Sequence, residues 1–119
     1  MKNLLGAAGE AAAARYLRAK GYTIEAANIR SRFGEVDLVA TNRAYIVFVE
    51  VKTRKSAAFA RPMEHVTARK LEKIKATALL YLSEHPTKLQ PRFDVIEVYL
   101  PNGPAGEPAH IEHLENVLC

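Results

Sequence analysis

The sequence predicts an α/β domain in which a helix, three strands, a second helix and two further strands follow one another. Two observations predict this class. Alanine-rich or amphipathic stretches with helical spacing lie at residues 5–20 and 67–84, and short runs of β-branched and aromatic residues fill the intervals. With 119 residues, 49% of them hydrophobic and 25% charged, the chain has the size and composition of a single domain, residues 1–119.

Composition limits the classes of function. The formal net charge of +4 favours an anionic partner without identifying one, since many basic proteins bind nothing acidic. The single cysteine, Cys119, forms no disulfide within the chain and fits a reducing compartment. No apolar run approaches the roughly 20 residues that span a bilayer, so we expect no membrane segment and a cytoplasmic location.

The first helix is expected at residues 5–20, where alanines are frequent and Gly21 provides a stop. Its apolar face is small enough to pack closely against a sheet and consists of Ala13, Ala14, Tyr16 and Leu17. A short strand at residues 22–28 and a cation-rich turn at residues 30–34 follow.

The next two strands, at residues 34–39 and 46–52, are expected to form a hairpin around the connection at residues 41–44. A tight loop centred between Arg43 and Ala44 places residue 37 directly opposite residue 50, because both are equally distant from the centre of the loop. Residues directly opposite in an antiparallel pair share a face of the sheet.

The second half of the chain begins with a connection at residues 54–66, whose length is typical of a functional loop. Thr67 would cap a second helix that ends near Glu84, before Pro86. The buried stripe of this helix is expected to contain Leu71, Ile74, Ala78 and Leu82. The remaining elements are a strand at residues 93–100, a Pro/Gly loop at 101–108 and an edge strand at 110–117.

Three charged residues interrupt the two apolar strands of the hairpin: Asp37, Glu50 and Lys52. An ionised side chain near a β core costs free energy unless a partner or a metal satisfies it. Alternation along a strand puts Glu50 and Lys52 on one face, and the expected register brings Asp37 to the same face. A slip of one residue would move Asp37 to the opposite face, so the register tests the idea of a shared site.

The order of these charges resembles the PD-(D/E)xK nuclease superfamily, which includes restriction endonucleases and archaeal Holliday-junction resolvases. The similarity is closest to the YraN-like family of small bacterial endonuclease-like proteins and covers nearly the whole chain. Val36 stands where the superfamily name has proline. The motifs that carry the resemblance are Gly9-Glu10, Asn28-x-Arg30, Gly34-Glu35-Val36-Asp37-Leu38, Phe48-Val49-Glu50-Val51-Lys52-x-Arg54 and Arg92-Phe93-Asp94-Val95.

The resemblance implies a restriction-endonuclease-like αβββαβ core with a mixed central sheet and flanking helices. It also implies an endonuclease, dependent on Mg²⁺ or Mn²⁺, that hydrolyses DNA, with branched or structured DNA among the candidate substrates and a homodimer as a candidate assembly. The metal would be held by Asp37, Glu50 and the backbone carbonyl of Val51, with Glu10 binding or supporting it. Lys52 would orient or deprotonate the attacking water. Mg²⁺ prefers such oxygen ligands, and phosphoryl transfer depends on charge stabilisation.

Glu50, Lys52 and Glu10 also have structural explanations that need no catalytic role. Glu50 and Lys52 would form a simple ion pair on a solvated strand face, an interpretation that the presence of Asp37 and the other motifs disfavours. Glu10 is equally well explained as a carboxylate near a helix N-terminus, stabilised by the helix dipole. The alternative function is a nucleic-acid-binding or partner-binding module with a nuclease-like fold and no turnover.

Six cations flank the acidic residues or lie in the first turns of the second helix, and we favour phosphate contact over simple solvation for Arg30, Arg32, Arg54, Arg69, Lys70 and Lys73. Other polar residues are assigned structural places. Glu35 shares the face of Asp37, and we favour a strand-end position facing solvent over a supporting role at the site. For Asp94 we favour a structural pair with Arg92 over contact with the site. Because they are three apart on a strand, His110 and His113 should point to opposite faces and not chelate a metal together.

Overall fold

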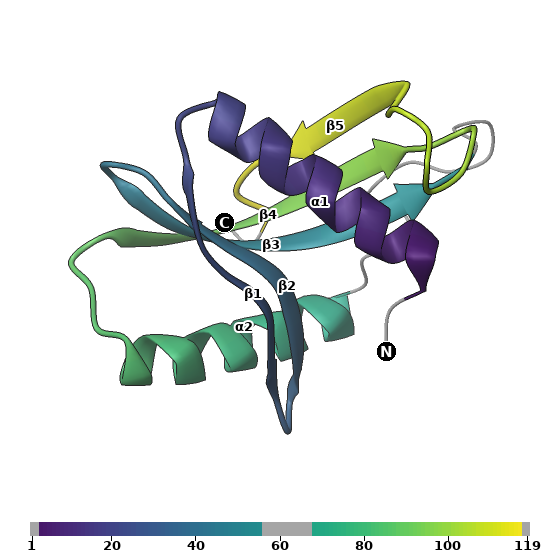
Figure 1. Cartoon of the computed structure of the whole chain (residues 1–119). Helices are drawn as coiled ribbons and strands as arrows, with labels where there is room; N and C mark the ends of the chain where they lie inside the picture. Colours follow the sequence, from purple (N-terminus) through teal and green to yellow (C-terminus); the bar gives the residue numbers. More distant parts are fainter. Residues whose placement is uncertain (1–2, 56–67, 118–119) are drawn as a thin grey trace.

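Within residues 3–55 and 68–117, which the computed structural model describes, five strands form one sheet with a helix on each face (Figure 1). The strands lie in the order β1-β2-β3-β4-β5, antiparallel throughout except for the parallel pair of β3 and β4. The α/β class, the element order and the mixed sheet are therefore confirmed, and they are compatible with a restriction-endonuclease-like core. The elements are α1 (Leu4–Ala19), β1 (Thr23–Ser31), β2 (Gly34–Thr41), β3 (Tyr45–Arg54), α2 (Ala68–Glu84), β4 (Gln90–Tyr99) and β5 (His110–Leu114).

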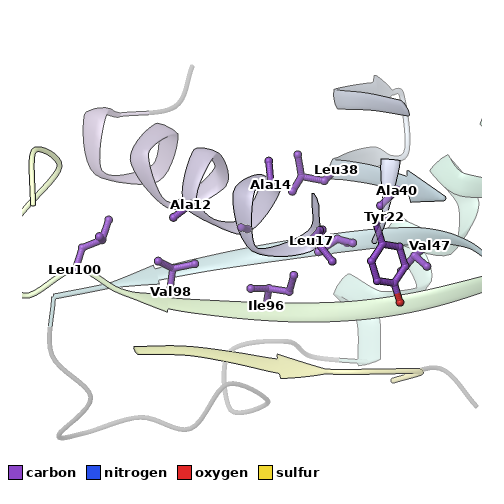
Figure 2. Packing of buried hydrophobic residues seen from close by; sticks show 12 residues of the cluster. Ala12, Ala14, Leu17, Tyr22, Leu38, Ala40, Val47, Ile96, Val98 and Leu100 are labelled. Atoms are coloured by element: carbon purple, nitrogen blue, oxygen red, sulfur yellow. The ribbon is translucent and has the colours of Figure 1, made fainter. Parts of the chain in front are cut away.

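Helix α1 begins at an N-cap, where the side chain of Asn3 accepts a hydrogen bond from the backbone N–H of Gly6 at 2.7 Å. Its small side chains let it lie close to the sheet: Figure 2 shows Ala12 above β4 and Ala14 pointing toward Leu38 of β2. Gly9 has no side chain, and a Cβ there would overlap the hydroxyl of Thr53. The alanine-rich face and this glycine therefore set the distance between α1 and β3.

Helix α2 covers the other face of the sheet, where Phe48 stacks on Phe93 with ring centroids 5.5 Å apart and meets Tyr81 edge-on. The predicted stripe is partly correct: Ile74 and Ala78 are buried, while Leu71 and Leu82 are only half-buried. Thr77 and Tyr81 take their places in the interior because their hydroxyl groups have hydrogen-bond partners on β1, namely Ser31 and Glu25.

The register of the β2–β3 hairpin is the predicted one, since Leu38 pairs with Val49 and Thr41 with Ile46. The ladder ends at the Leu38–Val49 pair, beyond which β2 stays with β1. The strand predicted to end at Asn28 instead continues to Ser31, which pairs with Gly34. The expected cation-rich turn is accordingly shorter than predicted, because the β1–β2 ladder extends almost to the hairpin tip.

Strict alternation of faces breaks in β2. Val36 and Val39 both pack in the cluster against α2, although they are three residues apart, and Leu38 packs in the cluster against α1. The break lies opposite Asn28, whose φ of 53° is left-handed and rare inside a strand. Asp37, next to this break, lies on the same face of the sheet as Val39, the face that α2 covers.

The last two strands differ in length from the sequence prediction. Strand β4 starts at Gln90 instead of residue 93, because its parallel pairing with β3 begins at Tyr45. Strand β5 is the expected edge strand but ends at Leu114. Asn116 has a left-handed φ of 58° and donates its backbone N–H to Asp94, which takes the chain away from the ladder.

The described ranges contain no helix that is both long enough and apolar enough to cross a membrane. Of the predicted connection at residues 54–66, only the first two positions belong to the described part of the chain, and Thr67, the expected cap, lies outside it.

Candidate active site

The candidate site lies where β2 and β3 separate. Asp37 is 3% exposed, and its Oδ2 accepts a hydrogen bond from the backbone N–H of Val51 at 2.8 Å. Glu50, the residue before Val51, is 7% exposed. Both carboxylates line a hollow of about 440 Å³ that Lys70 and Lys73 of α2 also line. The predicted shared face of Asp37 and Glu50 is therefore present.

Two ammonium groups approach the same carboxylate oxygen. Lys70 Nζ lies 2.8 Å from Glu50 Oε1, and Lys52 Nζ lies 3.8 Å from it. The convergence of Asp37, Glu50 and Lys52 agrees with the sequence prediction. Lys70 was predicted only as a phosphate contact on an exposed ridge, and the structure brings it into the acidic centre instead.

Burial and neighbouring charges act on the proton affinities of this group. Burial raises the pKa of Glu50 above its ordinary value, and the negative charge of Asp37 raises it further, against the opposing effect of Lys70. Burial lowers the pKa of Lys52, and the nearby ammonium of Lys70 lowers it further. Burial also acts to lower the pKa of Lys70, but its hydrogen bonds to Glu50 and Lys52 and the negative charges of Glu50 and Asp37 together outweigh this effect, and the pKa is raised.

The donor set fits a hard cation. Carboxylate oxygens are the protein ligands that Mg²⁺ takes in small number, with water and substrate oxygens completing the coordination. Among the described residues no three or more His, Cys, Asp or Glu side chains gather closely enough to hold a metal ion, so Asp37 and Glu50 would supply the side-chain ligands. Coordination by the carbonyl of Val51 stays a prediction.

Glu10 is buried on the α1 side of the sheet, as its position on the packing face predicts. It lines a separate hollow of about 340 Å³ together with Val51 and Lys52. Glu10 therefore reaches the strand that carries the site from the face opposite Lys70. Its role as a metal ligand or support stays a prediction.

Comparison with known proteins identifies a family. Residues 9–98 match the family model described as "Uncharacterised protein family UPF0102". The chain belongs to the UPF0102 family. Similar UPF0102 proteins include one from Caldanaerobacter subterraneus subsp. tengcongensis, 48% identical over 83% of this chain and 82% of the relative. Another from Syntrophomonas wolfei is 44% identical over 98% of both chains, and one from Nocardia farcinica is 45% identical over 98% of this chain and 90% of the relative.

In this UPF0102 protein the six predicted phosphate-contacting cations do not form one surface. Arg69 and Lys73 line the hollow beside Lys70. On the hairpin, Arg30 lies 3.4 Å from Glu35, and Arg32 lies over the ring of Phe33. Glu35 also lines the hollow, so it faces the site and not simply the solvent as predicted.

Arg54 is held by a residue that sequence reasoning missed. Its Nε donates to Oε1 of Glu97 at 3.2 Å, and Glu97 is fully buried on β4 directly beside Lys52 in the parallel register. The Oε2 atom of Glu97 is buried and has no hydrogen-bond partner among residues 3–55 and 68–117. The signal was present, because Glu97 interrupts an apolar strand just as Glu50 does.

Asp94 and Arg92 form a buried structural pair on the α1 face. Asp94 accepts two hydrogen bonds from Arg92, at 2.9 and 3.0 Å, and one from the backbone of Asn116. The ring of His113 lies 2.6 Å from the same carboxylate. His110 instead stacks on Tyr99, so the two histidines occupy different surroundings, as their spacing predicted.

Proposed function

We propose that this UPF0102 protein is a metal-dependent endonuclease that hydrolyses phosphodiester bonds in DNA. The observation that supports it most is that two buried carboxylates, Asp37 and Glu50, share one open hollow with the ammonium group of Lys70. The ammonium group of Lys52 lies 3.8 Å from Glu50. Burying several charges together costs desolvation free energy that a stabilising role alone does not require.

Each side chain has a distinct task in this proposal. Asp37 and Glu50 would hold Mg²⁺ or Mn²⁺, which when bound supplies Lewis-acid polarisation of the phosphate and activation of water. Lys52 would position the attacking water and offset the negative charge that grows on the phosphodiester. Glu10, from the opposite face, would support this arrangement next to Val51.

The surrounding cations support a nucleic-acid substrate chosen by shape. Arg69 and Lys73 line the hollow, and Arg30 and Arg32 lie on the β1–β2 hairpin that borders it. Contacts from such cations are made to phosphates, which give affinity and position but carry no base sequence. We therefore favour structured or branched DNA as the substrate.

One observation favours a second candidate function. Lys70 already neutralises Glu50 at 2.8 Å, and a site that balances its own charges requires no metal to be stable. A non-catalytic nucleic-acid-binding module would retain the cations and the fold. The experiment must therefore separate cleavage from binding.

The test uses four DNA substrates: supercoiled plasmid, a single strand, a flap and a four-way junction. Each is incubated with the wild-type protein and with the Lys52→Ala and Glu50→Gln variants, in Mg²⁺, Mn²⁺ or chelator. The matched control is Lys75→Ala, which removes one charge from an exposed position of α2. DNA affinity is measured separately by fluorescence anisotropy in Ca²⁺.

We expect cleavage of at least one substrate by the wild type and by Lys75→Ala, only with a divalent ion. Lys52→Ala should cleave at least about 100-fold more slowly, with DNA affinity little changed, because a group that acts in the transition state adds little to ground-state binding. Tight DNA binding without cleavage of any substrate would favour the binding module. Equal cleavage by Lys52→Ala would contradict the mechanism.

A further inference from the structure

The site contains an ion pair between Lys70 and Glu50, and Lys70 lies outside the strand motifs that predicted the site. Lys70 comes from α2, not from the strands that carry Asp37, Glu50 and Lys52, yet its Nζ makes the shortest ion pair to Glu50, 2.8 Å from Oε1. A carboxylate oxygen that accepts a hydrogen bond from an ammonium is poorly placed to coordinate a divalent ion as well. Metal binding through this oxygen requires Lys70 to move.

The charge balance leads to the same requirement. Two carboxylates and two ammonium groups make the centre formally neutral, so a divalent ion gains little net attraction while both lysines remain. Lys52 is anchored on β3, and its side chain is 22% exposed. The side chain of Lys70 is 38% exposed and extends from a helix that lines the hollow, so a change of its rotamer can move the ammonium group away from Glu50 toward solvent.

The hollow offers Lys70 a second place. Arg69 and Lys73 line the same space, and the three cations together would surround a phosphate group of a bound strand. An ammonium displaced from Glu50 would therefore join these neighbours. The exchange replaces one carboxylate–ammonium contact with one phosphate–ammonium contact.

We propose that Lys70 is an exchangeable counter-ion of the site: its ammonium neutralises Glu50 until a divalent cation takes that oxygen, and it then contacts a phosphate of the substrate. The inference rests on the proposed function, because it needs Asp37 and Glu50 to be metal ligands. It adds that Lys70 weakens metal binding to the free protein and couples it to DNA binding. A permanent structural ion pair would also weaken metal binding, but it would not couple metal binding to DNA binding.

The test is calorimetric titration of Mn²⁺ into the DNA-free protein at constant ionic strength. Four proteins are compared: wild type, Lys70→Gln, Lys70→Arg and Lys75→Gln, each with a thermal melt to verify folding. Lys70→Gln should bind Mn²⁺ about tenfold or more tightly than wild type, because one competing charge is gone. Lys70→Arg, which keeps the charge, and Lys75→Gln, which removes a charge elsewhere on α2, should bind as wild type does.

Anisotropy with a four-way junction tests the second half of the exchange. Adding Ca²⁺ should tighten DNA binding by the wild type more than by Lys70→Gln, and an equal increase overturns the phosphate contact. Equal Mn²⁺ affinity of wild type and Lys70→Gln, or equal tightening by Lys70→Gln and Lys70→Arg, overturns the competition while leaving the nuclease proposal intact. No Mn²⁺ binding even by Lys70→Gln overturns both, because the carboxylates then hold no cation when the ammonium is removed.

Discussion

The carboxylate of Asp37 accepts a hydrogen bond from the backbone N–H of Val51 at 2.8 Å, across the gap where β2 and β3 have stopped pairing. A side chain thus takes the donor that a ladder partner would otherwise satisfy. The contact attaches Asp37 to β3, the strand that carries Glu50. The distance between the two carboxylates is therefore set by this hydrogen bond as well as by the β2–β3 pairing.

Replacing Asp37 should separate folding from metal binding. Asp37→Asn keeps an oxygen acceptor for Val51 and should melt close to wild type. Asp37→Ala leaves that N–H without its partner and should lower the free energy of unfolding by about 1–3 kcal/mol. Both should lose the stabilisation that Mn²⁺ gives to the native state. Thermal melts with and without Mn²⁺ measure both effects, and equal metal stabilisation of Asp37→Asn and wild type would remove Asp37 from the ligand set.

The two cations beside Lys70 should act on DNA affinity and its salt dependence. The double variant Arg69→Gln/Lys73→Gln should bind every DNA sequence more weakly, and the slope of log affinity against log salt should fall by about 2, since two phosphate contacts are lost. Anisotropy at several salt concentrations measures the slope. The matched control is Lys75→Gln/Lys88→Gln, which removes the same charge from exposed positions. Identical slopes for the two double variants would mean that only net charge matters.

Gly9 should be sensitive to the smallest substitution. Gly9→Ala places a Cβ where Thr53 now lies, so we expect the free energy of unfolding to fall by about 1–3 kcal/mol through overpacking. Thr53→Ala removes the hydroxyl that the Cβ meets first, and the double variant should recover part of the loss. Denaturant unfolding of the four proteins gives the coupling energy. Strict additivity would show that α1 does not press on β3 at this point.

The Asp94 cluster should give stability a defined pH dependence. Burial acts to raise the pKa of Asp94, but hydrogen bonds from His113, Arg92 and Asn116 outweigh it and lower the pKa. A lowered folded-state pKa contributes stability at pH values above the ordinary carboxyl value, about 4, and this contribution is lost as the pH falls through the folded-state pKa.

Asp94→Asn should therefore be less stable than wild type by roughly 3 kcal/mol near neutral pH, because it leaves Arg92 buried without its counter-charge. The difference should shrink as wild-type Asp94 becomes protonated in acid. Urea unfolding at pH 7 and near pH 3 measures it. Glu107→Gln, which removes an exposed acid, is the control and should show little difference at either pH.

The sequence predicted correctly the features that depend on a short loop or on the alternation of side chains along a strand. The hairpin loop fixed which residues of β2 and β3 face each other, and alternation along β3 put Glu50 and Lys52 together. Alternation alone does not place Val36, which packs against α2 together with Val39 although the two are three residues apart. The change of face lies beside the left-handed backbone of Asn28 on the paired strand β1. Asparagine adopts a left-handed φ more readily than most residues, but the residue type alone does not place one inside a strand.

Other features depend on distances between elements that are remote in the sequence. The sequence predicts Lys70 as an exposed cation on a helix, and only the packing of α2 against the sheet brings it to Glu50. The contact between His113 and Asp94 forms only because β5 pairs with β4 in the sheet. Glu97 is different, since an acidic residue inside an apolar strand is itself a sequence signal of a buried polar site.

The early end of the β2–β3 ladder at Leu38 and Val49 has a consequence for how the protein family can diversify. The outer part of the β1–β2 hairpin pairs only with itself within the sheet, and it meets α2 where Ser31 is hydrogen-bonded to Thr77 and where Gly34 lies against Lys73. Its tip can lengthen or shorten without shifting Asp37, whose place is set from β3. In the proposed nuclease, changes at the hairpin tip would therefore alter the contacts with a substrate while Asp37 and Glu50 stay in place.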